Sequence, residues 1–130
     1  MSRPSRALAA KVVARASERC EYCLLSQRGQ EAQFHIGHVI PVAANGVTTY
    51  ENLAVACVSC SLRKGARRLV PDPFSGEMAP VFNPRTEKWQ DHFEMRESQI
   101  LGRTPMGRAT VAALAMNRPV AVAIRRGAMT

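Results

Sequence analysis

Hydrophobic residues in the first part of the chain recur at the spacing of a helix. Leu8, Val12 and Val13 fall on one face between residues 4 and 18. Pro4 stands near the first turn, where a helix needs no backbone N–H from it. We therefore predict a helix over residues 4–18. The polar face of this helix is basic, facing either solvent or a phosphate backbone, and carries Arg6, Lys11, Arg15 and Arg19.

The pattern changes to alternation after a loop at residues 27–30. Phe34 and Ile36 share one face while His35 and Gly37 share the other, which predicts a strand over residues 33–39. Proline, turn and helix-ending residues then divide the next segment. The expected order is an end of the strand at Pro41, a turn at residues 43–46, a second strand at 53–56, and a helix at 58–64 that ends at Gly65.

The second half of the chain is richer in turn residues. Four prolines and a glycine fall between residues 70 and 84, which predicts an ordered loop that wraps the surface. Residues 89–96 predict a helix in which His92 packs beside aromatic rings rather than taking part in catalysis. A threonine followed by Pro105 is typical of a helix N-cap, and one or two further helical turns are expected over residues 119–126.

Length and composition favour one small domain with a thin core. The chain has 130 residues, of which 46% are hydrophobic but only 5% aromatic. A chain of this size buries a modest share of its surface, so a bound metal would add useful stability. No apolar run is long enough to cross a bilayer. Lys11 and Arg15 interrupt the first apolar stretch, which is not typical of a secretory signal, so a cytoplasmic location is expected.

The net charge of +8 indicates a polyanionic partner, most simply nucleic acid. Arginine supplies 15 of the 18 basic residues, and its guanidinium binds phosphate oxygens in a bidentate way. A basic surface that is merely solvated is the alternative. We favour nucleic acid because the charge accompanies the motifs below.

All four cysteines fall in two Cys-x-x-Cys pairs, Cys20 with Cys23 and Cys57 with Cys60. Two such pairs can surround one tetrahedral zinc ion. Without a secretory signal this arrangement favours zinc over disulfides. A redox pair or simply buried thiols remain as alternatives.

The ordered set of a cysteine pair, His38, Asn52 and a second cysteine pair resembles the HNH endonuclease family. The similar phrases are His38-Val39-Ile40-Pro41, Glu51-Asn52-Leu53-Ala54 and Cys57-x-x-Cys60-x-x-x-Lys64-Gly65. Further phrases resemble a bacterial subgroup of HNH proteins: Val81-Phe82-Asn83-Pro84-Arg85, Trp89-x-x-His92-Phe93, Gly107-Arg108-Ala109-Thr110 and Met116-Asn117. The combination is specific, whereas any one phrase alone would be weak.

The resemblance implies an α+β fold: a small ββα-metal core, of the HNH or treble-clef kind, with a structural zinc and flanking N-terminal and C-terminal helices. We expect a single domain over residues 1–130, its core at residues 19–66, and a wrapping loop with C-terminal helices over residues 67–130.

The resemblance also implies a division of chemical roles. His38 would be the general base, since imidazole can take a proton from water near neutral pH. Asn52 would fix the orientation of that ring by a hydrogen bond. Mg²⁺ or another divalent cation would sit at the scissile phosphate. The zinc would be structural, because four thiolates leave no position open for water.

Two residues depart from the family pattern at the expected cation site. The residue before the base histidine is usually an acid or a histidine, and here it is Gly37. The residue after the last cysteine is usually histidine or asparagine, and here it is Ser61. His35 and Ser61 are the candidate substitute ligands, and an ordinary strand residue is the favoured alternative for His35. Glu51 and Asp72 are possible contributors from loops. The hairpin loop also differs, with Ala44-Asn45-Gly46 where the subgroup often has His-Gly-Gly.

Two main hypotheses follow for function. The first is a metal-dependent endonuclease acting on DNA with little sequence preference. The second is a zinc-containing nucleic-acid-binding module that has lost cleavage together with the ligands at Gly37 and Ser61. A purely structural zinc protein is a third, and the basic excess argues against it. The candidate phosphate contacts follow the second cysteine pair, where cations also suit a helix end: Arg63, Lys64, Arg67 and Arg68. The sequence makes no prediction of the oligomeric state.

Overall fold

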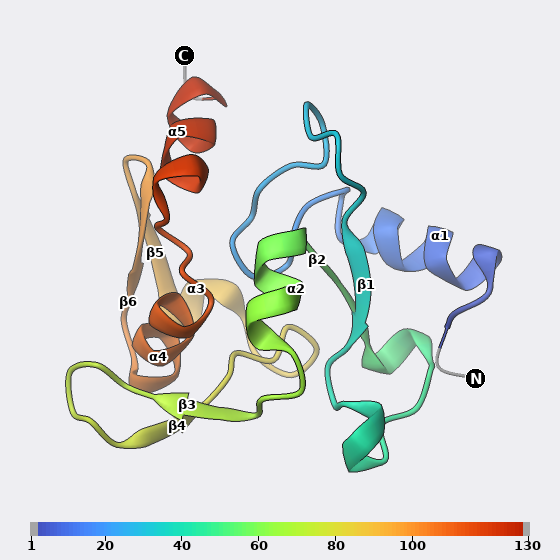
Figure 1. Ribbon diagram of the computed structural model, residues 1–130, viewed down its shortest axis with the longest axis horizontal. Helices are drawn as coiled ribbons and strands as arrows, with labels where there is room; N and C mark the ends of the chain where they lie inside the picture. The colour runs from blue at the N-terminus through green and yellow to red at the C-terminus, as the bar shows by residue number, and fades with distance from the viewer. Residues whose placement is uncertain (1–2, 129–130) are drawn as a thin grey trace. The chain divides into compact units, whose positions relative to one another are not determined.

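The computed structural model describes residues 3–128, which form two compact units (Figure 1). The N-terminal unit comprises the chain up to Ala66 together with Asn83–Thr86. The C-terminal unit comprises Arg67–Phe82 and the chain from Glu87 onward. Each unit has helices and a short antiparallel sheet, so the fold class is α+β, as the sequence predicts.

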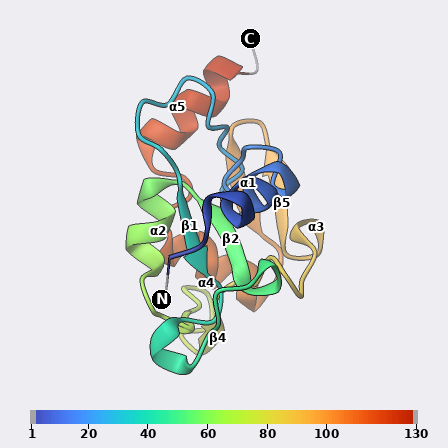
Figure 2. The same cartoon turned by 90° about the vertical axis from the view of Figure 1, so that its right-hand side faces the viewer.

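The N-terminal unit is a β-hairpin with a helix on either side (Figure 1). Strands β1 and β2 pair antiparallel, with His35 opposite Ala56 and His38 opposite Leu53. Figure 2 shows the two strands running side by side when viewed from the side of the first helix. The elements are α1 (Arg6–Arg15), β1 (His35–His38), the 3-10 turns η1 (Val42–Ala44) and η2 (Tyr50–Asn52), β2 (Leu53–Ala56) and α2 (Val58–Lys64).

Helix α1 lies on the hairpin through the apolar face that the sequence predicts. Val12 is fully buried against Leu53 and Val55, with Leu8 and Ile36 at the margin of this cluster. The helix is shorter than the predicted 4–18. Ser5 is its N-cap, with Oγ accepting from the N–H of Leu8 at 3.1 Å, so the regular turns begin only at Arg6.

Strand β2 and helix α2 confirm the ranges predicted for them. Cys57 caps α2 with its sulfur, which accepts from the N–H of Cys60, and Gly65 ends the helix at φ +52°. The turn between the strands contains Asn45 at φ +69°, where the subgroup has a glycine. Asparagine tolerates this left-handed conformation, so that departure is conservative. Gly46 is obligatory, because a Cβ there would lie 1.7 Å from the carbonyl oxygen of Ile40.

The C-terminal unit contains two hairpins and three helices among the residues described. Its elements are β3 (Leu69–Pro71), β4 (Met78–Pro80), α3 (Trp89–His92), β5 (Phe93–Arg96), β6 (Gln99–Gly102), α4 (Pro105–Ala113) and α5 (Pro119–Ala128). Strand β3 pairs with β4, and β5 pairs with β6. Val70, Ala79, Val81 and Ala109 form one buried cluster of this unit.

The loop predicted over residues 70–84 is wrong in its first part, which forms the β3–β4 hairpin. Asp72 builds the turn: its carboxylate accepts from the N–H of Phe74 at 3.0 Å and from the hydroxyl of Ser75 at 3.0 Å. The same carboxylate binds Arg108 of α4 through two further hydrogen bonds, of 3.0 and 2.8 Å. A single buried acid thus organises a segment whose prolines suggested irregular chain.

The helix predicted over residues 89–96 is also wrong beyond His92. Phe93–Arg96 is strand β5, which turns through Glu97 at φ +56° into β6. Nothing in the local pattern marks this turn, because it uses no glycine. His92 is packed as predicted, with Nδ1 2.7 Å from Oγ1 of Thr104 and Nε2 2.8 Å from Oε1 of Glu87.

The predicted cap of α4 is confirmed: Oγ1 of Thr104 accepts from the N–H of Gly107 at 3.0 Å, and Pro105 is the first helical residue. The turns expected after Pro119 form α5. No helix within residues 3–128 is long and apolar enough to cross a membrane. The single-domain organisation, with its core at residues 19–66, stays a prediction.

Candidate functional site

The four cysteines meet at the end of the hairpin in the N-terminal unit. Cys20 and Cys23 come from the loop after α1, while Cys57 and Cys60 come from the junction of β2 and α2. All four are buried, and their sulfur atoms lie within 4.8 Å of one another. The sulfurs of Cys23 and Cys57 are 3.7 Å apart.

This spacing fits a single tetrahedral zinc ion. Sulfurs bound to zinc at about 2.3 Å in tetrahedral geometry lie roughly 3.8 Å apart. Burial raises the pKa of the Cys20 thiol, whereas hydrogen bonds from neighbouring sulfurs lower the pKa values of Cys23 and Cys57. A buried set of thiols becomes a set of thiolates most readily when a cation balances their charge. The four cysteines therefore fit a structural zinc site.

His38 ends strand β1, half-buried, with its ring held at one nitrogen. Nε2 lies 2.8 Å from Oγ1 of Thr48, a residue in the loop that joins the two strands. Among the residues described, Nδ1 has no hydrogen-bond partner. One ring nitrogen is thus oriented and the other is unpaired, which is the arrangement that a general base requires.

Asn52 does not contact the imidazole, so the direct hydrogen bond implied by the resemblance is wrong. Its Oδ1 accepts from the N–H of Ile40 at 2.9 Å, and its Nδ2 donates to the carbonyls of Ile40 at 3.1 Å and Val47 at 2.9 Å. These bonds fix both ends of the loop that carries η1. Asn52 therefore holds the loop that also carries Thr48, the partner of the His38 ring.

His35 and Ser61, the two candidate substitute ligands, lie side by side. Nδ1 of His35 in β1 is 2.8 Å from Oγ of Ser61 in α2. Gly37 follows on the same face of β1, and a Cβ built there meets no atom within 4 Å. The space beside Gly37, where the resemblance implies the side chain of an acid or a histidine, is therefore open and not filled by core side chains.

A small cavity of about 60 Å³ adjoins these residues, and Gly37, His38, Ser61 and Lys64 are among those that line it. Lys64 is 7% exposed, and its ammonium donates to the carbonyls of His38 at 3.5 Å and Val39 at 3.4 Å. Within residues 3–128, no carboxylate lines the cavity. The positive charge of Lys64 beside it suits a phosphate oxygen better than a second cation.

The residues at this position do not fit the divalent cation implied by the resemblance. Within the part of the chain described, the only cluster of three or more metal-ligand side chains is the four cysteines. Mg²⁺ prefers carboxylates and water, whereas His35 and Ser61 offer one imidazole and one hydroxyl. Asp72 accepts hydrogen bonds from Arg108 in the C-terminal unit. Glu51 lies beside Arg15 and Tyr50 instead.

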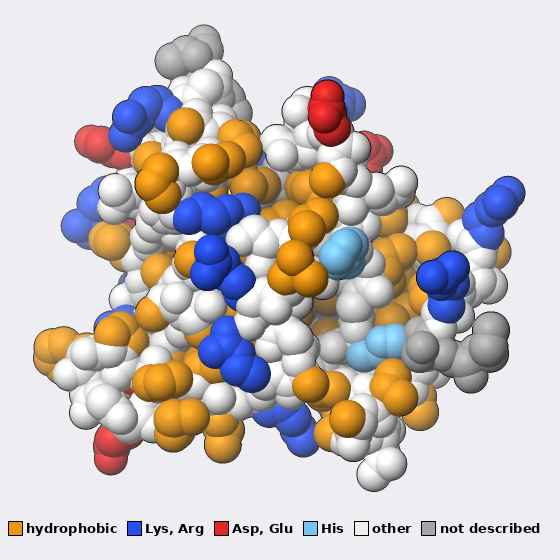
Figure 3. Space-filling model, viewed as in Figure 1, with side chains coloured by type: hydrophobic (Ala, Val, Ile, Leu, Met, Phe, Trp, Pro, Cys, Tyr) orange, Lys and Arg blue, Asp and Glu red, His pale blue; other side chains and the backbone are white. Residues whose placement is uncertain are grey.

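The four candidate phosphate contacts differ in exposure. Arg63, Arg67 and Arg68 are exposed, whereas Lys64 is buried. Arg63 donates to the hydroxyl of Ser59 at 3.2 Å, and Arg67 donates to the carbonyl of Ala113 at 3.3 Å. On the face shown in Figure 3, basic side chains are prominent and acidic ones lie mainly at the margins. The phosphate-binding role of these four residues stays a prediction.

The outer edge of β2 is satisfied by charged side chains that the sequence reasoning did not select. Glu21 donates its N–H to the carbonyl of Val55 and accepts from the N–H of Val55 through its carboxylate, each at 2.9 Å. Arg15 and Arg85 both donate to the carbonyl of Leu53. Arg85 stands in a phrase that resembles the HNH subgroup, and this phrase is the one feature of the sequence that could have pointed to it. No feature of the sequence pointed to Thr48 as the partner of His38.

Comparison with known proteins agrees with this geometry. The family model described as HNH endonuclease matches residues 20–67, a span that contains all four cysteines, His38 and Asn52. A separate comparison, with curated proteins, found no match to the chain.

Proposed function

We propose that this chain binds nucleic acid, DNA in the first place, and hydrolyses its phosphodiester bonds with His38 as general base. The match of the HNH endonuclease family model to residues 20–67 supports this proposal. The observation that carries the proposal is the state of the His38 ring, with Nε2 on Thr48 and Nδ1 unpaired among the residues described. A cytoplasmic setting belongs to the same proposal.

The ring can act as a base in one tautomer. When Nε2 carries the proton and donates to Oγ1 of Thr48, Nδ1 holds the lone pair. Nδ1 then takes a proton from water as the oxygen of that water attacks phosphorus. The bond from phosphorus to one ester oxygen breaks, and the leaving oxygen takes its proton from solvent. Lys64 supplies a fixed positive charge beside the cavity that His38 lines.

Cleavage by this route is slow. Charge stabilisation is usually the largest contribution to such a reaction, and Gly37 and Ser61 do not provide a cation site. A second candidate function is therefore nucleic-acid binding without cleavage. The specific observation in its favour is the cavity beside His38, which Lys64 lines together with no carboxylate from the part of the chain that the structure describes.

A plasmid assay separates the two functions. Purified protein is incubated with supercoiled DNA and Mg²⁺, Mn²⁺ or Ni²⁺, beside His38→Ala. We expect slow nicking that is lost in the variant. Nicking of equal rate in His38→Ala would exclude the base assignment. No nicking with any cation, together with a gel shift that weakens with salt, would select the binding function.

A further inference from the structure

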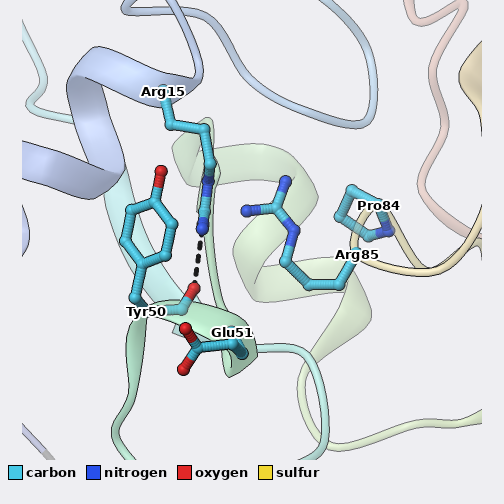
Figure 4. A pocket seen from close by; sticks show the side chains of 5 residues that line it. All are labelled: Arg15, Tyr50, Glu51, Pro84 and Arg85. Atoms are coloured by element: carbon cyan, nitrogen blue, oxygen red, sulfur yellow. Dashed lines mark hydrogen bonds between the residues drawn. The ribbon is translucent and has the colours of Figure 1, made fainter.

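A hollow of about 380 Å³ lies beside the outer edge of β2, on residues that have no assigned role. It is lined by Arg15, Tyr50, Glu51, Pro84 and Arg85 (Figure 4). All five belong to the N-terminal unit. Its volume is within the range of small-molecule and nucleotide sites.

Arg15 is held rigidly in this hollow. Its guanidinium lies over the ring of Tyr50, 3.9 Å from the centroid, and Nη1 donates to the carbonyl of Tyr50 at 2.7 Å. Figure 4 shows the side chain standing between Tyr50 and Arg85. No carboxylate pairs with Arg15 among the residues described, so its charge is fixed in place and is not neutralised by an ion pair.

Arg85 brings a second guanidinium to the same point. Its Nη1 donates to the carbonyl oxygen of Leu53 at 3.2 Å, the oxygen that also accepts from Nη2 of Arg15 at 2.5 Å. Two cations that share one acceptor lie close together and repel each other. Glu21 offsets only one of the two charges through its ion pair with Arg85. An anion placed in the hollow would relieve the remainder.

A second hollow, of about 680 Å³, continues along α1. It shares Arg15, Tyr50 and Glu51 with the first hollow and adds Lys11, with Leu8 and Ala14. We call the two hollows together the α1 groove. The groove presents three basic side chains, Lys11, Arg15 and Arg85, and the exposed ring of Tyr50. Basic side chains combined with an aromatic ring are typical of surfaces that bind a nucleic-acid strand.

We propose that the α1 groove binds the phosphodiester backbone of nucleic acid, with one phosphate against Arg15 and Arg85 and the strand continuing past Lys11. The inference rests on the proposed nucleic-acid function and adds a second contact surface, apart from the residues that follow the second cysteine pair. Glu51 opposes this ligand and limits its affinity, because its exposed carboxylate lines both hollows.

The contrasting explanation is that both arginines serve only the edge of β2. In that case the exposed charges of the groove have no effect on nucleic acid. Lys11 and Glu51 separate the two explanations, because both side chains are exposed and neither carries a hydrogen bond of the β2 edge among the residues described. Their substitution leaves the packing of Arg15 intact.

The test is fluorescence anisotropy of a labelled 20-nucleotide strand, and of its duplex, over a range of salt concentrations. We expect Lys11→Gln to weaken binding about fivefold and to lower the salt slope by roughly one. Glu51→Gln should tighten binding about threefold. Arg15→Lys keeps the charge but loses the fixed fork and the contact with Tyr50, so binding should weaken. The matched control is Arg28→Gln, an exposed arginine on a loop outside the groove.

Equal affinities for wild type, Lys11→Gln and Glu51→Gln would overturn the α1 groove while leaving the proposed function intact. The same holds if Arg28→Gln weakens binding as much as Lys11→Gln, because the effect would then be one of net charge. A wild-type protein that binds neither oligonucleotide would overturn both proposals.

Discussion

Nδ1 of His35 lies 2.8 Å from Oγ of Ser61, so these side chains join strand β1 to helix α2 at the position where the resemblance to HNH endonucleases implies a catalytic cation. The contact joins an imidazole and a hydroxyl, without an acid. Next to it, Gly37 leaves room for a side chain that the backbone can already carry. The site therefore lacks side chains that would bind a cation, but it has room for one at position 37.

Restoring the two ligands should raise cleavage. In the double variant Gly37→Asp with Ser61→Asn, a carboxylate and an amide enter the open region beside His38, and we expect plasmid nicking in Mg²⁺ or Mn²⁺ to rise roughly 100-fold. The single variants should gain much less, because one ligand does not hold a cation. The measurement is the initial rate of nicking, with the double variant carrying His38→Ala as the control. A double variant no faster than wild type would show that the defect lies elsewhere.

Zinc should be required for folding of the N-terminal unit. A tetrathiolate site contributes about 10–16 kcal/mol of apparent binding free energy in small zinc domains, which exceeds the stability of most domains of this size. We expect one zinc per chain by elemental analysis, and loss of far-UV circular dichroism signal on treatment with a strong chelator.

Cys57→Ser is the matched variant, since it removes one sulfur with almost no change in volume. It should bind less zinc and melt at lower temperature. Zinc competes with protons for sulfur, so acidification should release the metal as well. A chelated protein with unchanged spectrum and melting temperature would refute the structural role.

The parts of this fold that could be predicted are those encoded over a few residues. The cysteine spacing, the capped helix at 58–64 and the cap at Thr104 each depend on neighbours within one turn, and the structure confirms the helices. The partner of His38 could not be predicted, because Thr48 lies ten residues further along the chain, inside the loop that joins the strands. The resemblance implied Asn52 instead, whose side-chain amide is bonded to backbone groups of that loop.

The C-terminal unit shows the same limit. The β5–β6 hairpin turns at Glu97, a residue whose type gives no sign of a positive φ, so the sequence predicts a single helix over residues 89–96. The α1 groove could not be predicted from the sequence for another reason. Arg15 and Arg85 are seventy residues apart, and they meet only because both donate to the carbonyl of Leu53.

Asn52 should matter for stability more than for direct contact with the base. Asn52→Ala removes three part-buried hydrogen bonds, which the buried Asn52 side chain makes to Ile40 and Val47, so we expect a loss of about 3 kcal/mol in the free energy of unfolding. Chemical denaturation followed by circular dichroism measures it. Asn45→Gly is the control, because its left-handed backbone suits glycine and little change is expected. A loss below about 0.5 kcal/mol would contradict the role of Asn52 in holding the loop.

The Asp72–Arg108 pair should give the C-terminal unit a specific sensitivity to acid. The guanidinium of Arg108, which donates two hydrogen bonds to the carboxylate, holds the pKa of Asp72 well below its usual range. Folding thus favours the ionised form. The stabilisation is fully present above the ordinary carboxyl pKa near 4, at about pH 5 and higher, and is lost as the pH falls from there towards the pKa of the folded state.

Asp72→Asn should therefore melt at lower temperature than wild type at pH 7, and the difference should shrink steadily below about pH 4. Asp91→Asn, at an exposed carboxylate outside the ion pairs of the described residues, is the control and should match wild type. A difference between Asp72→Asn and wild type that stays constant down to pH 2 would mean that the pair contributes by packing alone and not through its charge.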